Sequence, residues 1–310
     1  MTKMNENLVV THKVCDSAFL INLIELGKTY YNEDSLVINL NFLNWLYLDN
    51  PNGAAEMVFV KDGELLVGIV ALIPIMLESK EIKQDAFFAV NVLTHPLYRG
   101  KNLFGRMIEK IKELMSNKKK WLIGHPNSNA IKGWTKYSMQ FREPLVLFMN
   151  KYKLSNLWKF EKTRIENIAQ LMEIKENFWR GLAEKANFHV QYTPEFLAWR
   201  FLDSVGKNYT ITKISQRGNL LGLVITRKYK LCFDLLIDVI AKDDDVDKVL
   251  GSLVKPTLIA APSKGEFTES ISKVVSKLPL QKSFPFFVTT WSNDFDPYDF
   301  SGVTFSASDF

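Results

Sequence analysis

Cysteine and histidine are scarce in this sequence, which limits the chemistry available to it. Only two of the 310 residues are cysteine, Cys15 and Cys232, and four are histidine. The cysteines lie far apart and form no redox or metal-binding motif. The histidines do not show the spacing of zinc ligands. Low cysteine use is typical of a reducing compartment, so we expect a cytoplasmic protein with no metal.

Long apolar segments and several common motifs are also lacking. The longest apolar run, Leu65–Leu77, is too short to span a bilayer and contains Pro74, which predicts buried strands with a turn. Met1–Val10 has no apolar core of the kind found in signal peptides. The sequence contains no GxSxG, P-loop or GxGxxG motif.

The composition is that of an ordinary globular protein with room for two domains. Hydrophobic residues make up 47% and charged residues 24% of the chain. The net charge of +5 is modest and suits an anionic small molecule such as a CoA thioester. No basic stripe interleaved with aromatic residues accompanies this charge, so nucleic acid is not an expected partner.

The most informative stretch is Thr94–Met107, which lies between two different periodic patterns. An apolar run, Phe87–Leu93, predicts a strand before it, and Leu103–Met115 predicts an amphipathic helix after it. The first N–H groups of a helix and its dipole attract anions. Arg99 and Lys101 add positive charge at this junction. Because several consecutive N–H donors can converge on it, a pyrophosphate is the best-fitting anion.

This junction resembles the acyl-CoA pyrophosphate loop of the GNAT (Gcn5-related N-acetyltransferase) superfamily, Arg/Gln-x-x-Gly-x-Gly/Ala. Arg99 takes the first position, Asn102 stands at the usual Gly, and Phe104 at the usual Gly or Ala. Asn is the non-Gly residue that best tolerates positive φ, so Asn102 is a mild departure and Phe104 a larger one. Gly100 and Gly105 flank these positions. The cofactor-binding residues implied here are Arg99, Gly100, Lys101, Asn102, Leu103, Phe104 and Gly105.

The order of predicted elements in the first half is also similar to that of a GNAT domain. The resemblance implies an α/β fold with a mixed, mostly antiparallel sheet flanked by helices. It also places the end of a first domain near residue 153, with Leu145–Asn150 as its last strand. The WLYLDNPNG, THPLYRGK and GHPNSNA segments resemble a branch often found in bacterial surface-polysaccharide and amino-sugar pathways. The strands expected before Leu145–Asn150 are Leu8–Thr11, Met57–Val60, Leu65–Ile73, Ile75–Glu81, Phe87–Leu93 and Trp121–Gly124. The expected helices are Ser17–Tyr30, Asn41–Leu48, Leu103–Met115 and Ala130–Met139.

In this superfamily the cofactor lies where two neighbouring strands splay apart, here Phe88–Leu93 and Trp121–Gly124. The resemblance implies that backbone groups of Val92, Leu93 and Thr94 contact the pantetheine arm and the thioester carbonyl. The thiolate is usually protonated by a Tyr in the pattern Asn-x-x-Ala-x-x-Leu-Tyr-x-Lys-x-Gly-Phe. Asn127, Ala130 and Lys136 match this pattern, whereas the Tyr position holds Trp134. Either Tyr137 takes the role of acid, or the thiolate leaves without a protein acid.

Three further polar residues near this predicted gap each allow two interpretations. His95 is a candidate general base or proton relay, or it stabilises the Thr94–Pro96 turn through the backbone. Asn91 holds the acceptor or a water, or faces a polar edge. Asn127 contacts the cofactor or acceptor, or forms a turn.

The second half of the chain repeats the first at an offset of 154 residues. Phe42–Val70 aligns without gaps on Phe196–Val224, and eight positions are identical. About two identities would be expected by chance at a frequency near ~6% per position. We therefore expect two related domains, residues 1–153 and 154–310, with Glu166–Glu184 as a long helix of the second.

The second copy has lost the anion loop. Its counterpart, Ala241–Leu250, contains four aspartates and no glycine, so it would repel a pyrophosphate. This copy would complete the core, wall the acceptor cleft or mediate a homodimer. The whole pattern implies acetyl-CoA-dependent transfer in a ternary complex to an amine, preferably an amino sugar or its nucleotide. The alternatives are a protein or peptide amine as acceptor, and a degenerate binding or scaffold module.

Overall fold

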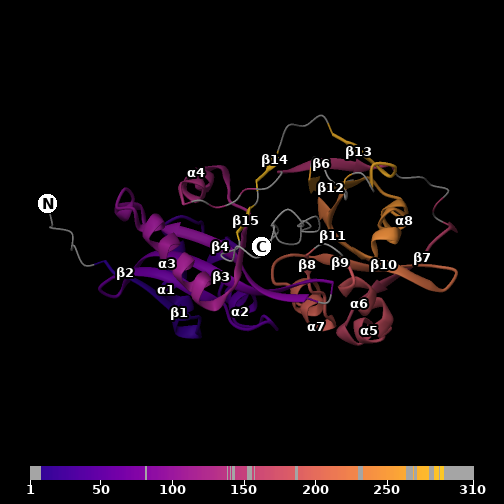
Figure 1. Cartoon of the computed structure of the whole chain (residues 1–310). Helices are drawn as coiled ribbons and strands as arrows, with labels where there is room; N and C mark the ends of the chain where they lie inside the picture. The colour runs from indigo at the N-terminus through magenta and orange to yellow at the C-terminus, as the bar shows by residue number, and fades with distance from the viewer. Residues whose placement is uncertain are drawn as a thin grey trace. The chain divides into compact units, whose positions relative to one another are not determined.

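The computed structural model contains two compact α/β units, each built around its own sheet (Figure 1). One unit comprises the described residues within Met1–Met76, Asp85–Gln140 and Phe287–Phe295, and the second those within Leu77–Gln84 and Phe141–Phe286. The structure describes residues 8–289 except 81, 138, 140, 142–143, 152–155, 157, 186–187, 230–232, 263–267, 269–270, 279–282 and 286.

The first unit has the strand order β1-β2-β3-β4-β5-β15. β4 and β5 run parallel, and the neighbours β1/β2, β2/β3 and β5/β15 run antiparallel. Its elements are β1 (Val10–Val14), α1 (Ser17–Gly27), η1 (Leu36–Ile38), α2 (Leu40–Tyr47), β2 (Glu56–Asp62), β3 (Leu65–Ser79), β4 (Ile82–Thr94), η2 (Pro96–Tyr98), α3 (Leu103–Lys118), β5 (Trp121–Gly124), α4 (Ser128–Lys136) and β15 (Phe287–Thr289).

The second unit repeats this plan with the order β13-β6-β12-β11-β10-β9-β7, and here β11 and β12 are the parallel pair. Its strands are β6 (Leu145–Asn150), β7 (Glu161–Ile165), β9 (Tyr209–Gln216), β10 (Asn219–Tyr229), β11 (Phe233–Ala241), β12 (Thr257–Pro262), β13 (Val275–Lys277) and β14 (Ser283–Phe284). The short β8 (His189–Val190) pairs instead with the end of β3, at Leu77 and Glu78. Its helices are α5 (Ile168–Met172), α6 (Glu176–Ala183), α7 (Pro194–Leu197), the π-helical turn η4 (Ala198–Leu202), η5 (Asp243–Asp245) and α8 (Val246–Gly251).

The 154-residue offset is visible in matching helix caps. The side chain of Asn39 accepts a hydrogen bond from the N–H of Phe42, and the side chain of Thr193 accepts one from the N–H of Phe196, at 3.0 and 3.1 Å. Each cap satisfies one of the donors that a helix start leaves open. Equivalent residues therefore begin the aromatic helix in both units.

The two central hairpins also share an irregularity at equivalent positions. Val60 pairs with Gly68 in the first hairpin, and Ile214 pairs with Gly222 in the second. In both cases the register shifts immediately beside this pair, as it does at a β-bulge. Both glycines face the following helix, because a Cβ there would meet Met107 of α3 in the first unit and Val249 of α8 in the second. The repeat thus extends to details of the backbone.

The two sheets exchange their last strands along the chain. β6 follows the first unit in sequence, but it pairs with β12 in the second sheet. The first sheet is completed by β15, from the far end of the described chain, which pairs with β5. The prediction that Leu145–Asn150 closes the first sheet was therefore wrong. A division of the repeats at residue 153 remains a prediction, and the compact units interleave across it.

Other differences from the predicted elements have local causes. Pro74 does not interrupt β3, because it lies beyond Leu72, the last β3 residue paired with β2, and its carbonyl accepts a hydrogen bond from Asn50. The long helix expected at Glu166–Glu184 is divided into α5 and α6. The predicted strand Leu8–Thr11 is shifted by two residues at its start and ends at Val14.

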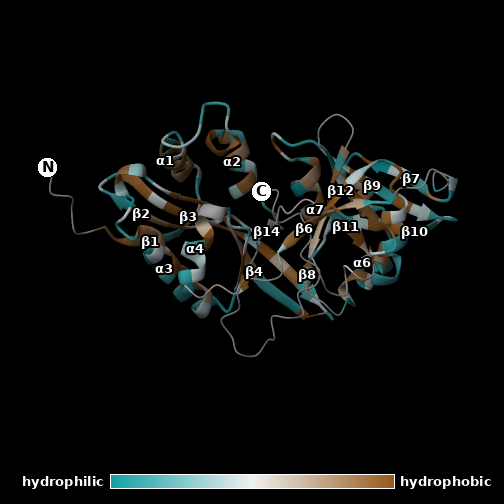
Figure 2. Cartoon of the chain, turned by 90° about the horizontal axis from the view of Figure 1, so that it is seen from above, coloured by the Kyte–Doolittle hydropathy of each residue, from teal (hydrophilic) through white to brown (hydrophobic). Residues whose placement is uncertain are grey.

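Apolar side chains fill the interior of both units, and the strands at the centre of each sheet are mostly hydrophobic in Figure 2. Helix α3 covers one face of the first sheet with its buried residues, among them Met107, Ile108 and Ile111. In the part of the chain that the structure describes, no helix is long and apolar enough to cross a bilayer.

Candidate functional site

The end of β4 is irregular at the position where the sequence predicts a cofactor gap. β4 pairs in parallel with β5 only as far as Ala89, opposite Gly124, and then continues to Thr94. Asn91 has a φ of +47° within this continuation, a left-handed conformation that is rare inside a strand. Val92, Leu93 and Thr94 follow it. The three backbone candidates therefore lie beyond the last paired residue of β5.

The loop after β4 turns the chain into α3 through two left-handed residues. Gly100 has a φ of +81° and Asn102 a φ of +56°. Glycine and asparagine are the residues that adopt this conformation at least cost, so the mild departure at Asn102 is structurally tolerated. Asn102 occupies the N-cap position of α3 but its side chain makes no capping hydrogen bond. The amides of Leu103 and the following residues are therefore not capped by Asn102.

Two cations border this helix start, and each lies over an aromatic ring. The Arg99 guanidinium is 5.2 Å from the ring centre of Tyr30, and the Lys101 Nζ is 5.0 Å from that of Tyr98. The Tyr98 hydroxyl donates a 2.6 Å hydrogen bond to Asp62, which anchors the 3₁₀ turn η2 to the β2–β3 hairpin. The positive charge is thus held at the loop by packing against aromatic residues.

Phe104 points towards α4. Its ring packs edge-on against Trp134 at 5.2 Å between centroids, and it fills the space beside Gly133, where a Cβ would overlap the ring. Trp134 is buried and also packs against Phe287 of β15. The bulky residue at this motif position thus joins α3 to α4. Burial and packing make Trp134 a core residue, and its indole ring offers no useful proton for a thiolate.

Tyr137 comes after α4 and lies against the first turn of α3. Its hydroxyl is 3.1 Å from Asn102 Oδ1 and is the atom that a Cβ on Gly105 would strike first. Asn102, Gly105 and Tyr137 are therefore brought together, although they are far apart in the sequence. The phenol lies where the loop begins its helix, so its observed contacts are with the predicted anion site.

Asn91 pairs with a buried phenol. Its Nδ2 donates a 2.5 Å hydrogen bond to the hydroxyl of Tyr47, a fully buried residue of α2. Burial raises the pKa of Tyr47, and the hydrogen bond from Asn91 acts in the opposite direction. The bond ties the irregular part of β4 to the aromatic helix. Asn91 thus has a structural partner in addition to its predicted catalytic role.

His95 and Asn127 both make local contacts of the structural kind. Nδ1 of His95 accepts a 3.3 Å hydrogen bond from the N–H of Leu97, and its ring packs edge-on against Tyr98. This bond requires an unprotonated Nδ1. Asn127 Oδ1 accepts a 3.0 Å bond from the N–H of Ala130 at the start of α4. The catalytic candidates His95, Asn91 and Tyr137 therefore make three separate sets of contacts, and their roles stay predictions.

The second unit has the same strand–turn–helix arrangement without a comparable anion site. The loop after β11 contains Asp243–Asp245 as η5 and leads into the short α8. Asp243 forms an ion pair with Lys185 at 2.9 Å, and Asp245 one with Lys248 at 2.6 Å. The carboxylates here are bound to lysines of their own unit.

Two contacts of the site have no signal in the sequence. The Asn91–Tyr47 and Tyr98–Asp62 hydrogen bonds join residues that are 44 and 36 positions apart. The one sequence signal at Asn91 is its place between two apolar residues, Val90 and Val92, which indicates that its side chain faces the opposite side of the strand from theirs. Among the described residues, no group of three or more His, Cys, Asp or Glu could hold a metal ion.

No family model and no curated protein matches this sequence. The solved structures give clear matches. A probable N-acyltransferase from Enterococcus faecalis V583 is 12% identical, with a TM-score of 0.64 over 91% of this chain and 73% of that one. A GCN5-related N-acetyltransferase from Anabaena variabilis is 9% identical, with a TM-score of 0.63 and the same shares. A tandem GNAT protein from the clavulanic acid biosynthesis pathway is 10% identical, with a TM-score of 0.55 over 93% and 100%.

These likenesses at low identity concern the fold. They agree with the two mixed sheets, the matching caps and the matching bulges described above. The predicted fold class is confirmed: the chain has a mixed α/β fold with two mixed sheets, as in tandem GNAT-like structures.

Proposed function

We propose that this protein is an acyl-CoA-dependent N-acyltransferase whose first unit holds the acyl-CoA. The backbone at the end of β4 supports this best. Asn91 is left-handed, and β4 continues beyond its last residue paired with β5. Helix α3 then starts beside the cations Arg99 and Lys101. Structural relatives include a probable N-acyltransferase and a tandem GNAT protein.

In the proposed binding mode, the first-turn amides of α3 and the two cations bind the pyrophosphate. The pantetheine arm runs along the backbone of Val92, Leu93 and Thr94. An N–H of this segment polarises the thioester carbonyl as the amine attacks it. The C–N bond forms, the C–S bond breaks, the amine loses a proton and the thiolate gains one. No covalent intermediate on the protein is required.

The proposed acyl group is acetyl, and the proposed acceptor is an amino sugar or a nucleotide-linked amino sugar. The support for this acceptor is the likeness of the WLYLDNPNG, THPLYRGK and GHPNSNA segments to a branch of that kind. A protein or peptide amine is the alternative acceptor. The reaction belongs to the cytoplasm, where acyl-CoA and nucleotide sugars occur together.

A second candidate is an acyl-CoA-binding module without catalysis, and one observation favours it. The position of the usual thiolate acid holds the buried Trp134, and Tyr137 contacts the loop at Asn102 and Gly105. If turnover requires a protein acid at this position, a site with the anion loop and without that acid would bind the cofactor and not turn it over.

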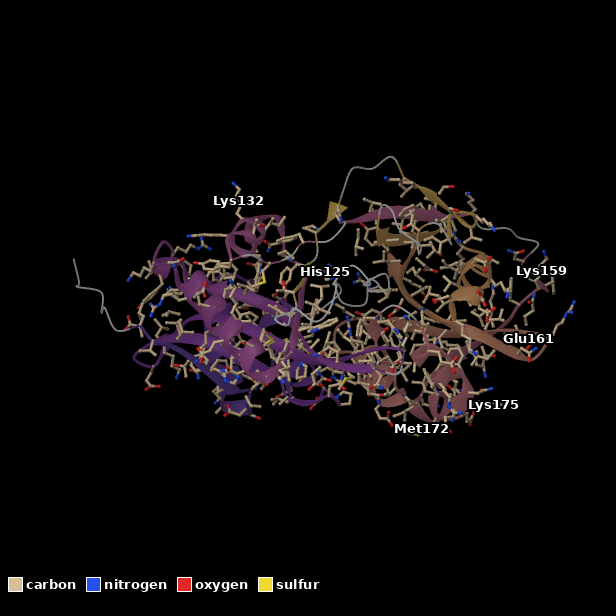
Figure 3. The ribbon with its side chains drawn as sticks, in the orientation of Figure 1. His125, Lys132, Lys159, Glu161, Met172 and Lys175 are labelled. Atoms are coloured by element: carbon tan, nitrogen blue, oxygen red, sulfur yellow. The ribbon has the colours of Figure 1, made fainter. Side chains whose placement is uncertain are left out.

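Calorimetric titration of acetyl-CoA tests the binding site. We expect micromolar affinity for the natural protein and a loss of about 10- to 100-fold in Arg99→Ala and Lys101→Ala, because each removes a charge from the anion site. Lys132→Ala is the matched control, since Lys132 projects outward from α4 (Figure 3). Equal affinity in all four proteins would exclude the loop as the binding site.

Turnover then separates the two candidates. Release of free CoA is followed with amino sugars, nucleotide-linked amino sugars, polyamines and peptides as acceptors. Turnover confined to the sugars supports the proposed acceptor, and turnover with peptides replaces it by the alternative. Tight acetyl-CoA binding with no turnover on any amine would favour the non-catalytic module.

A further inference from the structure

The helix that follows β11 in the second unit is much shorter than the helix that follows the equivalent β4 in the first. α3 has 16 residues and α8 has 6. At about 1.5 Å per residue, α8 is shorter by about 15 Å. In the first unit, the far end of α3 reaches Glu56 at the start of β2, where Lys118 binds it. Within the described residues, α8 ends at Gly251 and does not extend over the equivalent part of the second sheet.

The side chains on the sheet face that α3 covers in the first unit also differ between the two units. Val58 of β2 and Leu72 of β3 project from the same face of the first sheet, and both are fully buried. At the 154-residue offset their counterparts are Thr212 and Thr226, and the counterpart of Glu56 is Thr210. Thr210 and Thr226 lie directly opposite each other in the β9–β10 ladder. Hydroxyl groups thus replace apolar groups where the helix ends early.

This face forms a pocket of about 270 Å³, at the lower end of the volumes that small-molecule sites occupy. Ile214 and Val224, both almost fully buried, form an apolar floor. Hydroxyl side chains line the pocket above it: Thr210, Thr212, Thr226, Ser252 and Thr257. Because side chains alternate between the two faces of a strand, the residues from β9 and β10 that line the pocket all project from the same face of the sheet.

One wall of the pocket is a loop that a buried asparagine holds in place. The side chain of Asn150 donates to the carbonyls of Leu253 and Lys255 at 3.1 and 3.0 Å. Its Oδ1 accepts from the N–H of Thr257 at 2.8 Å. Asn150 is only 4% exposed, so these bonds are shielded from water. The wall is therefore fixed before any ligand arrives, which lowers the cost of binding.

The charge around the pocket is positive. Three lysines line it, Lys162, Lys228 and Lys255, against one carboxylate, Asp234, which is opposite Lys228 in the ladder. The Nζ of Lys162 donates a 2.6 Å hydrogen bond to the carbonyl of Ser252, which orients it at the pocket. Partial burial lowers the pKa of Lys162, and a bound anion would counteract that burial effect.

We propose that this pocket is a second ligand site, which binds a small phosphomonoester that also carries hydroxyl groups, such as a sugar phosphate. The ammonium groups bind the phosphate through charge-assisted hydrogen bonds. The hydroxyls of Thr210, Thr212 and Thr226 donate to and accept from the sugar hydroxyls. The apolar floor takes the carbon face of the ring. This site lies wholly in the second unit and does not depend on the acyl-CoA loop.

Calorimetric titration of glucose 6-phosphate tests the site, with inorganic phosphate and glucose as separate probes. The protein used is the full chain carrying Arg99→Ala and Lys101→Ala, so that the loop of the first unit does not compete for phosphate. We expect glucose 6-phosphate to bind with a Kd between about 10 μM and 1 mM, inorganic phosphate more weakly, and glucose not measurably.

Further substitutions in that protein locate the binding. Lys162→Met and Thr212→Val should each raise the Kd for glucose 6-phosphate by about tenfold or more. Valine already occupies the equivalent position 58 of the first unit, so Thr212→Val is compatible with the fold. Lys159→Met, an exposed lysine labelled in Figure 3, is the matched control and should change nothing.

Thermal unfolding of each variant without ligand shows whether it is folded. The proposal is overturned if glucose 6-phosphate shows no saturable binding, or if a folded Lys162→Met or Thr212→Val variant binds like its parent. It is also overturned if glucose binds as tightly as glucose 6-phosphate, because the lysines would then contribute nothing.

Discussion

The hydroxyl of Tyr137 lies against the Cα of Gly105 in the first turn of α3, so that a methyl group at position 105 would overlap it. In Gly105→Ala the new methyl group should therefore displace the Tyr137 phenol and itself cover the first-turn amides of α3. We expect the affinity for acetyl-CoA to fall about tenfold or more. The free energy of unfolding should change by no more than about 1 kcal/mol, because alanine is the better helix former and Tyr137 is free to swing out. Calorimetry and urea unfolding measure the two effects, and unchanged binding would contradict the assignment.

Tyr137→Phe separates a binding role from an acid role. If the hydroxyl serves the anion loop, as its contact with Asn102 indicates, the Kd for acetyl-CoA should rise about three- to tenfold and the pH profile of kcat should keep its shape. If it protonates the thiolate, kcat should fall and its alkaline limb should shift. Tyr229→Phe, an exposed tyrosine of the second unit, is the control. A lowered kcat with unchanged Kd would reject the binding role.

The Asn91–Tyr47 hydrogen bond should appear as an energetic coupling. Asn91→Gly keeps the left-handed backbone accessible but leaves the buried hydroxyl of Tyr47 without this donor, which should cost about 1–3 kcal/mol of stability. Combining it with Tyr47→Phe should cost less than the sum of the two single changes, since the phenol is then absent. Urea unfolding of the four proteins completes the cycle. Additive changes would mean that the bond contributes no coupling.

Glu56 should make stability depend on pH below neutrality. Burial would raise the pKa of this carboxyl, but hydrogen bonds from Lys118 and His12 outweigh it and leave the pKa below its ordinary value. The resulting stabilisation is fully present above the unfolded pKa of about 4.3 and is lost as the pH falls through the lower folded pKa.

Glu56→Gln should therefore lower the free energy of unfolding by about 1–3 kcal/mol at pH 7, and by progressively less as the pH falls below the unfolded pKa. Urea unfolding across this range gives the difference at each pH. Glu64→Gln is the control, because the Glu64 side chain is fully exposed and its pair with Lys61 is 3.5 Å long. A difference for Glu56→Gln that does not vary with pH would contradict the expected linkage.

The sequence predicted most of the fold because its strongest signals are local or repeated. The strand, loop and helix around Thr94–Met107 follow from hydrophobic periodicity and from the residues at the turn. The 154-residue offset predicted the tandem, and the matching caps at Asn39 and Thr193 show how far it extends. Asn102 adopts the left-handed conformation that its residue type allows.

What the sequence did not reveal depends on contacts between distant residues. The partner of β6 is set by the surface that its side chains bury, and no local pattern records that choice. The direction of Phe104 depends on the small Gly133, which is 29 positions away. The sequence also did not indicate that Tyr137, the acid in one of its two alternatives for the thiolate, contacts Asn102, because this contact depends on how the end of α4 packs over the start of α3.

The exchange of β6 and β15 has a consequence for the order in which the chain folds. Phe287 of β15 pairs with Gly124, a separation of 287 − 124 = 163 residues. Contacts of such long sequence range form slowly, because a large loop must close first. During synthesis the β5 edge of the first sheet stays unpaired until Phe287–Thr289 has left the ribosome. A chain ended at residue 153 would keep that edge exposed and should aggregate.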